Sequence, residues 1–373
     1  METRQFNLLA LAALISLIAA GVVHSAYNSL DQEVVAGQKV FPSLERRSGD
    51  VNEVVLQQAG KTITLKKTDD GKGWGIVERG GYPVDAKNVR EIVVKLSQAE
   101  LIEPKTRDPK RYGQLELGDP KAKDASSRLV RFLDKSAKPI AEVVVGKNRY
   151  AAFGTGQSGT YLRKPGEKQT WLAKLDLKAP MDVSDWVAPV FFRVAKDKIK
   201  SLVVKDGETT VYKVVPDEAQ AGKFKVVDIP SGRVLKKDFR IDETINGVRT
   251  LEMLDVRKRT EKDGKPDRVA VLTMTDGAEY TVGMKRDGTD DKERWMTVEV
   301  KVPEDAEAAK LAKAVAEDTQ GWSFRIAEWR ARHTFKGLDD MYDKVEAEAK
   351  DTPPGATKAE DAAKPATTEA QPK

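Results

Sequence analysis

Side chains that could support catalysis are sparse in this chain. It has two histidines and no cysteine. His24 lies inside an apolar segment and His333 lies near the other end in a basic run, so the two cannot share a soluble site. This arrangement excludes a multi-histidine zinc centre, and the missing cysteines exclude disulfides and thiolate chemistry. Because no serine occupies a Gly-x-Ser-x-Gly motif, we interpret His333 as a surface or partly packed residue.

A glycine pattern at residues 154–159, Gly-Thr-Gly-Gln-Ser-Gly, matches the dinucleotide-binding fingerprint as a string. The fingerprint works only where a helix follows, because the helix N-terminus holds the pyrophosphate. Here the run Thr160–Arg163 follows, and it has β-strand character. We therefore predict a flexible hairpin loop at 154–159, and the sequence has no phosphate-binding loop of the Gly-Lys-Ser/Thr type.

Carboxylates are plentiful, so counting residues does not exclude a glycosidase-like pair of acids. Asp185 beside Trp186 and Glu328 beside Trp329 come closest to the setting that raises the pKa of a carboxyl group, an acid among aromatics. Both acids occupy equivalent places in the two halves of the chain. We therefore interpret them as caps that precede a structural element.

Two acidic segments, 69–71 and 287–291, have some of the residues that bind calcium weakly. Neither matches the full loop of an EF-hand, so we interpret both as acidic turns. The sequence thus predicts no catalytic residue, no cofactor-binding residue, no metal-binding residue and no cofactor.

The charge distribution argues against nucleic acid as a partner. Of 373 residues, 64 are Lys or Arg and 59 are Asp or Glu, and the signs alternate along nearly every segment. A nucleic-acid-binding protein usually concentrates its basic charge on one face. The one basic cluster, which Asp108 interrupts, is interpreted as a solvated loop; it comprises Lys105, Arg107, Lys110 and Arg111.

The N-terminal segment predicts a membrane anchor. No charged residue lies between Arg4 and Asp31, and Leu8–Val23 reads LLALAALISLIAAGVV. Sixteen residues of α-helix span about 24 Å. A few further residues at each end, of types that a membrane tolerates, lengthen the helix to the thickness of a bilayer's hydrocarbon core, roughly 30 Å. A buried helix of a soluble domain would have a polar face, which this segment lacks.

A cleaved signal peptide is the alternative for the same segment. Val23-His24-Ser25 before Ala26 is a passable cleavage site. The basic region that should precede a signal is weak, however, since Glu2 offsets Arg4. We therefore predict an uncleaved, single-pass anchor in the bacterial cytoplasmic (inner) membrane with the body in the periplasm.

The remaining pattern predicts an α+β fold. Short strand-like runs separated by turn signals form an antiparallel meander, and a helix follows in which Asp85 is the cap and Val89, Ile92, Val93 and Leu96 share one face. The second half repeats this order, with a further helix at Glu304–Glu317, so we predict a two-fold degenerate repeat. Shared composition could mimic part of that repeat. The predicted segments are a membrane anchor or signal peptide (1–28), a stalk (29–48), a first α+β repeat domain (49–195), a second (196–344) and a disordered tail (345–373) that has no large apolar residue beyond Val345.

Several short motifs resemble the bacterial family known as domain of unknown function 4340. They include Gly81-Tyr82-Pro83-Val84-Asp85 before a helix, Leu117-Gly118-Asp119-Pro120, Val145-Gly146-Lys147 and Gly159-Thr160-Tyr161-Leu162-Arg163, and the similarity is clearest over Val51–Val194. The resemblance implies one N-terminal membrane anchor, a large extracytoplasmic part and an association with ABC transport systems of the gliding-motility type. It implies no catalytic residue.

These observations favour a non-enzymatic envelope protein that serves as an accessory or scaffold, with membrane transport subunits as the partners that the resemblance implies. The alternative is a periplasmic binding module for a cell-envelope component, which would use exposed aromatic side chains such as Trp74, Tyr82, Tyr150 or Tyr161. A secreted hydrolase that uses carboxylates alone is a third hypothesis, and it requires two acids that face each other across a cleft.

Overall fold

The computed structural model describes residues 16–20 and 37–345, apart from 238, 289–291 and 305. Residues 16–20 are helical, and the rest of the expected anchor lies outside the described residues, as does the tail from 346 onward. Among the described helices, none has both the length and the apolar character needed to cross a membrane. The anchor and the disordered tail therefore stay predictions.

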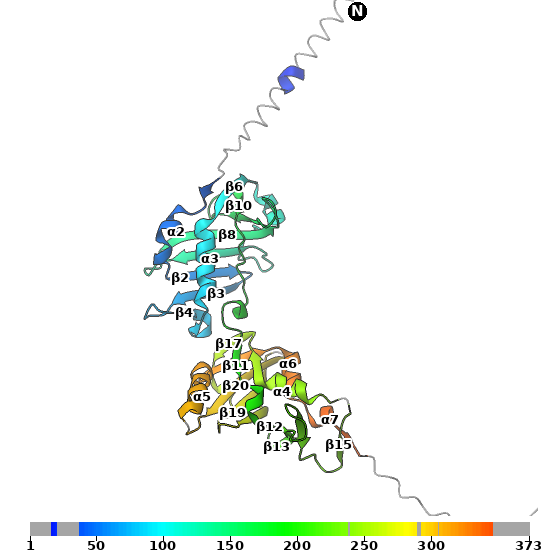
Figure 1. Ribbon diagram of the computed structural model, residues 1–373. Coiled ribbons are helices and arrows are strands. Elements are labelled where there is room, and N and C mark those ends of the chain that lie inside the picture. The colour runs from blue at the N-terminus through cyan, green and yellow to red at the C-terminus, as the bar shows by residue number, and fades with distance from the viewer. Residues whose placement is uncertain (1–15, 21–36, 238, 289–291, 305, 346–373) are drawn as a thin grey trace, which may run out of the picture.

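The body is α+β, as predicted, and consists of two lobes that each contain an antiparallel sheet (Figure 1). The first lobe has a ten-stranded sheet in the order β1-β6-β10-β9-β8-β7-β2-β3-β4-β5. Its strands are β1 (Gln38–Lys39), β2 (Glu53–Gln58), β3 (Lys61–Lys67), β4 (Trp74–Ile76), β5 (Tyr82–Pro83), β6 (Glu100–Pro104), β7 (Arg128–Leu133), β8 (Pro139–Arg149), β9 (Gly159–Arg163) and β10 (Thr170–Lys174).

Helix α3 (Ala86–Gln98) crosses one face of this sheet (Figure 1). Asp85 caps it, because the Asp85 carboxylate accepts a hydrogen bond of 2.9 Å from the backbone N–H of Lys87. Val89, Ile92, Val93 and Leu96 are buried against the sheet. The predicted cap and apolar face are both confirmed.

Residues 38–47 form part of the first lobe and not part of a stalk. β1 pairs with β6, and helix α2 (Pro42–Arg47) follows directly. Val40 and Leu44 are fully buried, and the Ser43 hydroxyl donates a hydrogen bond of 3.0 Å to the carbonyl of Ile140. The expected stalk at 29–48 is therefore wrong for these residues, because two isolated apolar side chains gave no periodic signal in the sequence.

The connection between the lobes runs through 175–189 and ends in β11 (Val190–Arg193). β11 pairs with β16 (Thr250–Glu252), and the ring of Phe192 contacts the ring of Tyr280 edge-on at 5.4 Å. β11 thus belongs to the second lobe, although the predicted boundary at 195/196 placed it in the first.

The second lobe has an eight-stranded antiparallel sheet in the order β14-β13-β12-β18-β19-β20-β21-β17. Its strands are β12 (Ile199–Asp206), β13 (Thr209–Pro216), β14 (Phe224–Val227), β17 (Asp255–Lys258), β18 (Arg268–Met274), β19 (Glu279–Asp287), β20 (Glu293–Lys301) and β21 (Trp322–Ile326). The helices are α4 (Ile241–Arg249), α5 (Ala306–Thr319), α6 (Glu328–Thr334) and α7 (Leu338–Met341), and a small ladder joins β15 (Arg233–Leu235) to β22 (Tyr342–Lys344). Short 3₁₀ turns complete the chain: Ser48–Asp50, Val77–Arg79, Pro109–Leu115, Val183–Asp185, Lys196–Lys198 and Glu261–Asp263.

One hydrophobic core runs through both lobes, from Val40 in the first to Tyr342 in the second. A second, smaller cluster lies within the first lobe and comprises Tyr112, Leu117, Val144, Tyr161 and Leu172. The continuity of the main core means that the lobes pack directly on one another.

Candidate functional site

An ion pair and an aromatic cluster hold the two lobes together. Arg79, in the 3₁₀ turn after β4, donates to both carboxylate oxygens of Asp255 at the start of β17, at 2.7 and 3.0 Å. This two-point contact raises the pKa of the Arg79 guanidinium. The backbone N–H of Asp85 adds a hydrogen bond of 2.9 Å to the carbonyl of Trp186 in the connection.

Tyr82 provides the aromatic part of this joint. Its ring lies edge-on to Trp322 at 4.9 Å and to Phe324 at 6.1 Å, and both partners belong to β21 of the other lobe. Phe191 stacks on Phe324 with ring centroids 4.1 Å apart. Burial, with a smaller contribution from the negative charge of Asp318, raises the pKa of Tyr82 to about 12.

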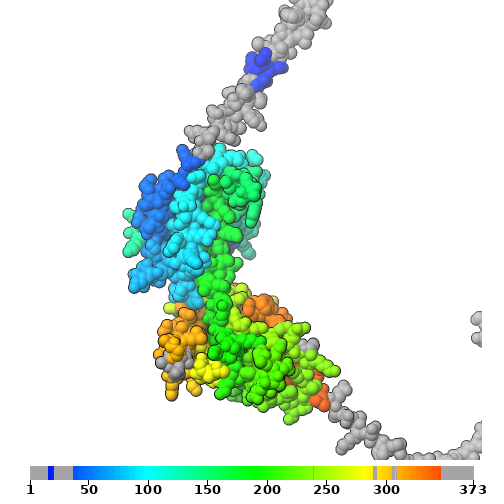
Figure 2. Space-filling view, in the orientation of Figure 1, coloured from blue at the N-terminus to red at the C-terminus, as the bar shows by residue number. Residues whose placement is uncertain are grey.

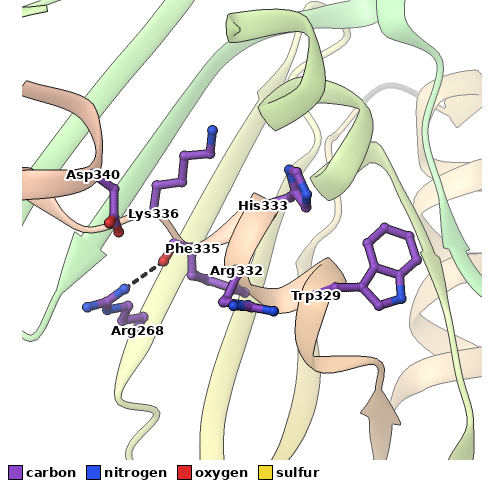
Figure 3. A pocket seen from close by; sticks show the side chains of 7 residues that line it. All are labelled: Arg268, Trp329, Arg332, His333, Phe335, Lys336 and Asp340. Atoms are coloured by element: carbon purple, nitrogen blue, oxygen red, sulfur yellow. Dashed lines mark hydrogen bonds between the residues drawn. The ribbon is translucent and has the colours of Figure 1, made fainter. Parts of the chain in front are cut away.

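A hollow in the second lobe lies beside α6 and has a volume of about 430 Å³ (Figure 3). We call it the α6 hollow. Its lining consists of one exposed aromatic ring, three cationic side chains, a histidine, a buried phenylalanine and one carboxylate: Trp329, Arg268, Arg332, Lys336, His333, Phe335 and Asp340.

Helix α6 places the polar and aromatic groups of the hollow on neighbouring positions. Arg332 and His333 follow Trp329 by three and four residues, which puts both of them one helical turn from Trp329. The Trp329 residue is 55% exposed, and its ring lies edge-on to His333 at 6.1 Å. His333 is half-exposed, as predicted for a surface or partly packed residue, and its Nδ1 lies 3.8 Å from Glu243.

The cations of the hollow differ in how they are neutralised. Arg268 donates to Asp206 at 2.9 Å and to the carbonyl of Phe335 at 2.6 Å. Arg332 and Lys336, in contrast, form no ion pair with any described residue, although Lys336 Nζ lies 4.8 Å from the ring centre of Phe239. The Arg330 guanidinium lies 4.9 Å from the centre of the Trp329 ring. The α6 hollow therefore combines two cations that form no ion pair with a described residue and an exposed tryptophan, which is a setting for an anion that carries a flat or apolar face.

Two further hollows adjoin this one and share Arg268 with it, and their volumes are about 190 and 530 Å³. Asp206 lines both, and Asp267 lines the smaller. Asp267 pairs with Lys285 and Arg286 at 3.4 Å each, so these charges compensate one another. The two lining cations of the α6 hollow that form no ion pair with a described residue thus come from α6 (Arg332) and from the residues directly after it (Lys336).

The four aromatic residues predicted to form a binding groove lie in different settings. Tyr82 is in the joint between the lobes, and Trp74 packs partly against the main core. Tyr161 is buried in the small cluster of the first lobe, whereas Tyr150 is 89% exposed in the loop after β8. The expected groove of these four side chains is therefore not formed.

The two acid–tryptophan pairs are not equivalent in the structure. Trp186 is 2% exposed and its indole N–H donates to the carbonyl of Pro180 at 3.1 Å, whereas Trp329 is largely exposed. Neither acid is a cap: Asp185 ends its 3₁₀ turn, and Glu328 is the first residue of α6 after Ala327. The predicted capping role is wrong, since the residue that precedes the 3₁₀ turn is Asp182 and the residue that precedes α6 is Ala327.

The remaining motifs form turns and loops. Gly159 begins strand β9, so no helix follows the glycine pattern. Asp70 accepts a hydrogen bond of 2.5 Å from the hydroxyl of Thr68, which lowers the pKa of this carboxyl group. In the second acidic segment, Asp287 pairs with Arg257 at 2.8 Å, and 289–291 lie outside the described residues. No cluster of three potential metal ligands occurs in the described part of the chain.

The sequence analysis missed Arg332, Lys336 and the exposure of Trp329 as parts of one surface. A usable signal was present, because Glu328–Lys336 is a short amphipathic run in which basic and aromatic residues recur at intervals of three and four. A run of seven helical residues is too short for that periodicity to stand out from a loop.

The fold and these surfaces define a two-lobed α+β protein of antiparallel sheets with open, basic hollows. The chain belongs to the family described as Domain of unknown function (DUF4340), which matches residues 74–271. The match extends from β4 to β18 and so includes parts of both lobes. No match was found among the curated proteins or among the solved structures.

Proposed function

We propose that this protein is a membrane-anchored, extracytoplasmic, non-enzymatic accessory or scaffold protein, and that its partners are subunits of an ABC-type transport complex. The N-terminal apolar segment supports the anchor, and the family resemblance supports the choice of partner. The location outside the cytoplasm follows from the anchor within this proposal.

The observation that carries the proposal is the joint between the lobes. A scaffold must hold its binding surfaces at a fixed separation, and here Arg79–Asp255, the Tyr82 cluster and a continuous core fix one lobe on the other. Figure 2 shows the lobes end to end, with the green connection running between them. The body is therefore an elongated unit that presents two sheets to its surroundings.

An unpaired sheet edge supplies a surface on which a partner could dock. β14 pairs with β13, and within the described residues no strand pairs with its other edge. Exposed edges of this kind bind other proteins by adding a strand to the sheet. We place the partner-binding surface at this edge of the second lobe.

The test is purification of the full-length protein from its native membranes in mild detergent, followed by mass spectrometry of the proteins that co-purify. We expect permease and ATPase subunits of a transport complex, and we expect to lose them when residues 1–28 are replaced by a cleavable signal peptide. Val226 forms a non-hydrogen-bonded pair with Val214, so its backbone N–H faces away from β13. Replacement of Val226 by proline removes this donor from the free edge and should weaken the same complex. A protein without partners in the soluble periplasmic fraction would contradict the proposal.

The α6 hollow favours a second candidate function, a binding module for an anionic cell-envelope component. Its support is the exposed indole of Trp329 beside the available charges of Arg332 and Lys336. In a thermal-shift titration, anionic cell-wall fragments should raise the melting temperature of the wild type and not that of the Trp329→Ala/Arg332→Gln variant. An equal shift of the melting temperature in both proteins would exclude the α6 hollow as the binding site.

We further propose that the two lobes arose by duplication of one unit. In each sheet a three-stranded meander, β4-β3-β2 or β14-β13-β12, lies beside four strands in chain order and then an earlier strand, β6 or β17. A helix, α3 or α4, precedes that last strand in each lobe. Sequence profiles built separately for the two halves from family members should align with each other, and profiles that match no better than shuffled ones would contradict the duplication.

A further inference from the structure

The first lobe has a strongly basic surface where two loops meet at one end of its sheet. Four of its cations come from the segment after β6, one from the last residue of β9 and two from the turn between β9 and β10. We call it the basic end surface, and its members are Lys105, Arg107, Lys110, Arg111, Arg163, Lys164 and Lys168. The first four were identified in the sequence as a solvated loop, and the tertiary structure adds the other three.

Hydrogen bonds join the two segments along their length. The backbone N–H of Lys105 donates to the carbonyl of Thr170 at 2.8 Å, and the N–H of Thr170 donates to the carbonyl of Thr106 at 2.9 Å. The Arg107 guanidinium donates to the side chain of Gln169 at 2.6 Å. The two segments, and the cations they carry, therefore lie side by side at this end of the sheet.

Carboxylates on this surface do not neutralise it. Glu103 pairs with Lys105, and Asp108 accepts a backbone hydrogen bond of 3.0 Å from Lys110. Glu167 is the third acid on these two segments. Seven cations and three carboxylates leave four net positive charges, while the whole chain carries a net charge of +5.

The charged ends of these side chains are available to a partner. Arg107, Lys110, Arg111 and Lys168 are exposed, and none of them forms an ion pair with a described residue. Arg163 lies over the ring of Tyr112 at 5.0 Å and Lys164 over the ring of Phe41 at 5.5 Å. These ring contacts fix the two half-buried cations in place at the border of the surface.

The register of β1 places the first described residue of the body, Gly37, near this surface. Gln38 lies opposite Leu101 and Lys39 opposite Glu100 in an antiparallel pair, so Gly37 lies toward the end of β6 that continues into Lys105. Between the predicted anchor, 1–28, and Gly37 there are eight residues, which span at most about 29 Å when fully extended.

We propose that the basic end surface binds the anionic phospholipid headgroups of the membrane in which the N-terminal segment is anchored. The proposal rests on the anchor of the proposed function. The short connection keeps the surface close to the bilayer, and an anionic membrane surface attracts each Lys or Arg that lies near it. The lipid contact sets the orientation of the first lobe, and hence of the whole rigid body, relative to the membrane.

The test uses the full-length protein reconstituted in phosphatidylcholine vesicles, with or without phosphatidylglycerol. Because the chain has no cysteine, a single Gln114→Cys substitution beside the surface accepts one fluorophore, and lipids with a headgroup quencher report its proximity. Ala219→Cys, in the second lobe, provides the distant reference site. We expect quenching at position 114 that requires phosphatidylglycerol and decreases in high salt, and little change at position 219.

The deciding variant carries Arg107→Gln, Lys110→Gln, Arg111→Gln and Lys168→Gln. We expect the phosphatidylglycerol-dependent part of the quenching to weaken by at least about tenfold. The matched control removes four exposed cations from the second lobe, and we expect it to behave as the wild type; its substitutions are Lys198→Gln, Lys200→Gln, Lys262→Gln and Lys313→Gln. Circular dichroism melts confirm that both variants fold.

Equal quenching with and without phosphatidylglycerol, or equal loss in the two variants, would overturn the proposal. Extraction of the vesicles with alkaline carbonate tests the anchor separately. If carbonate removes the protein but the wild type still floats with anionic vesicles at low salt and the deciding variant does not, the anchor fails and the lipid-binding surface stands. A wild type that floats with neither kind of vesicle contradicts both.

Discussion

Arg79 and Asp255, 176 positions apart in the sequence, meet in a two-point ion pair that joins the lobes. The Arg79 side chain is 32% exposed and the Asp255 side chain 17% exposed. The pair is thus partly withdrawn from water, and Asp255 also accepts a hydrogen bond of 2.8 Å from the backbone N–H of Val256. Its position next to the Tyr82 cluster makes it part of the joint and not an incidental surface contact.

Replacing Arg79 by alanine should lower the free energy of unfolding by about 1–3 kcal/mol, because Asp255 is left half-buried without its partner. Urea unfolding followed by circular dichroism measures the change. The charge-reversed double variant Arg79→Asp/Asp255→Arg should recover part of the loss. Arg240→Ala, which removes an exposed pair at 3.8 Å to Glu243, is the control. Equal losses for Arg79→Ala and Arg240→Ala would show that the joint does not depend on the ion pair.

Tyr82 should make stability depend on pH in the alkaline range. Burial first, and Asp318 second, raise the pKa of Tyr82 to about 12 in the folded protein, from 10.0 for an ordinary tyrosine. The neutral phenol is therefore favoured in the folded state, so its contribution is complete below pH 10 and is lost as the pH rises toward 12. The whole effect amounts to about 2 kcal/mol.

The measurement compares wild type with Tyr82→Phe in urea at pH 9 and at pH 12. The other buried tyrosines, such as Tyr212, are present in both proteins, so their contributions cancel in the difference. We expect Tyr82→Phe to lose less stability than the wild type over this interval. Identical pH dependence in the two proteins would mean that the phenol of Tyr82 ionises as readily as in the unfolded chain.

The cap of α3 gives a third prediction. Asp85→Ala removes the carboxylate that accepts the N–H of Lys87 and should cost about 1 kcal/mol of stability. Asp85→Asn keeps an acceptor at the same position and should cost less than the alanine variant. Thermal melts compare the stabilities of the two variants. An asparagine variant as unstable as the alanine variant would contradict a capping role for Asp85.

The two tryptophans that look alike in sequence should respond differently to substitution. Trp186→Ala leaves a cavity at a side chain that is 2% exposed and donates to Pro180, so we expect a loss of about 3–5 kcal/mol. Trp329→Ala removes an exposed ring from the α6 hollow and should change stability by at most about 0.5 kcal/mol. Chemical denaturation compares the two, and comparable losses would show that Trp329 is part of the core.

Local signals in the sequence were sufficient for individual elements. The apolar spacing of Val89, Ile92, Val93 and Leu96, with Asp85 before it, predicts α3 because helix formation depends on neighbours three and four residues apart. The β-strand character of Thr160–Arg163 excluded a dinucleotide site for a similar reason. Both inferences use interactions within a few residues, which the sequence displays directly.

Contacts between distant residues were not accessible in this way. The sequence has no mark that Tyr82 would meet Trp322, or that Lys168 would join the basic cluster at Lys105–Arg111, because these proximities depend on strand order and register. The burial of Trp186 and the exposure of Trp329 likewise depend on what packs above each ring.

By itself, the sequence determined the α+β composition, the helix cap, the apolar N-terminal segment and the family resemblance, since all of these depend on residue type and short-range spacing. The tertiary structure decided the assignment of residues 38–47 and β11 to their lobes, the joint through Arg79 and Asp255, the α6 hollow and the basic end surface. The physical reason is that side chains interact only when they are close in space. Folding alone brings residues 60 or more positions apart into contact, as it does for Thr106 and Thr170, which are 64 positions apart.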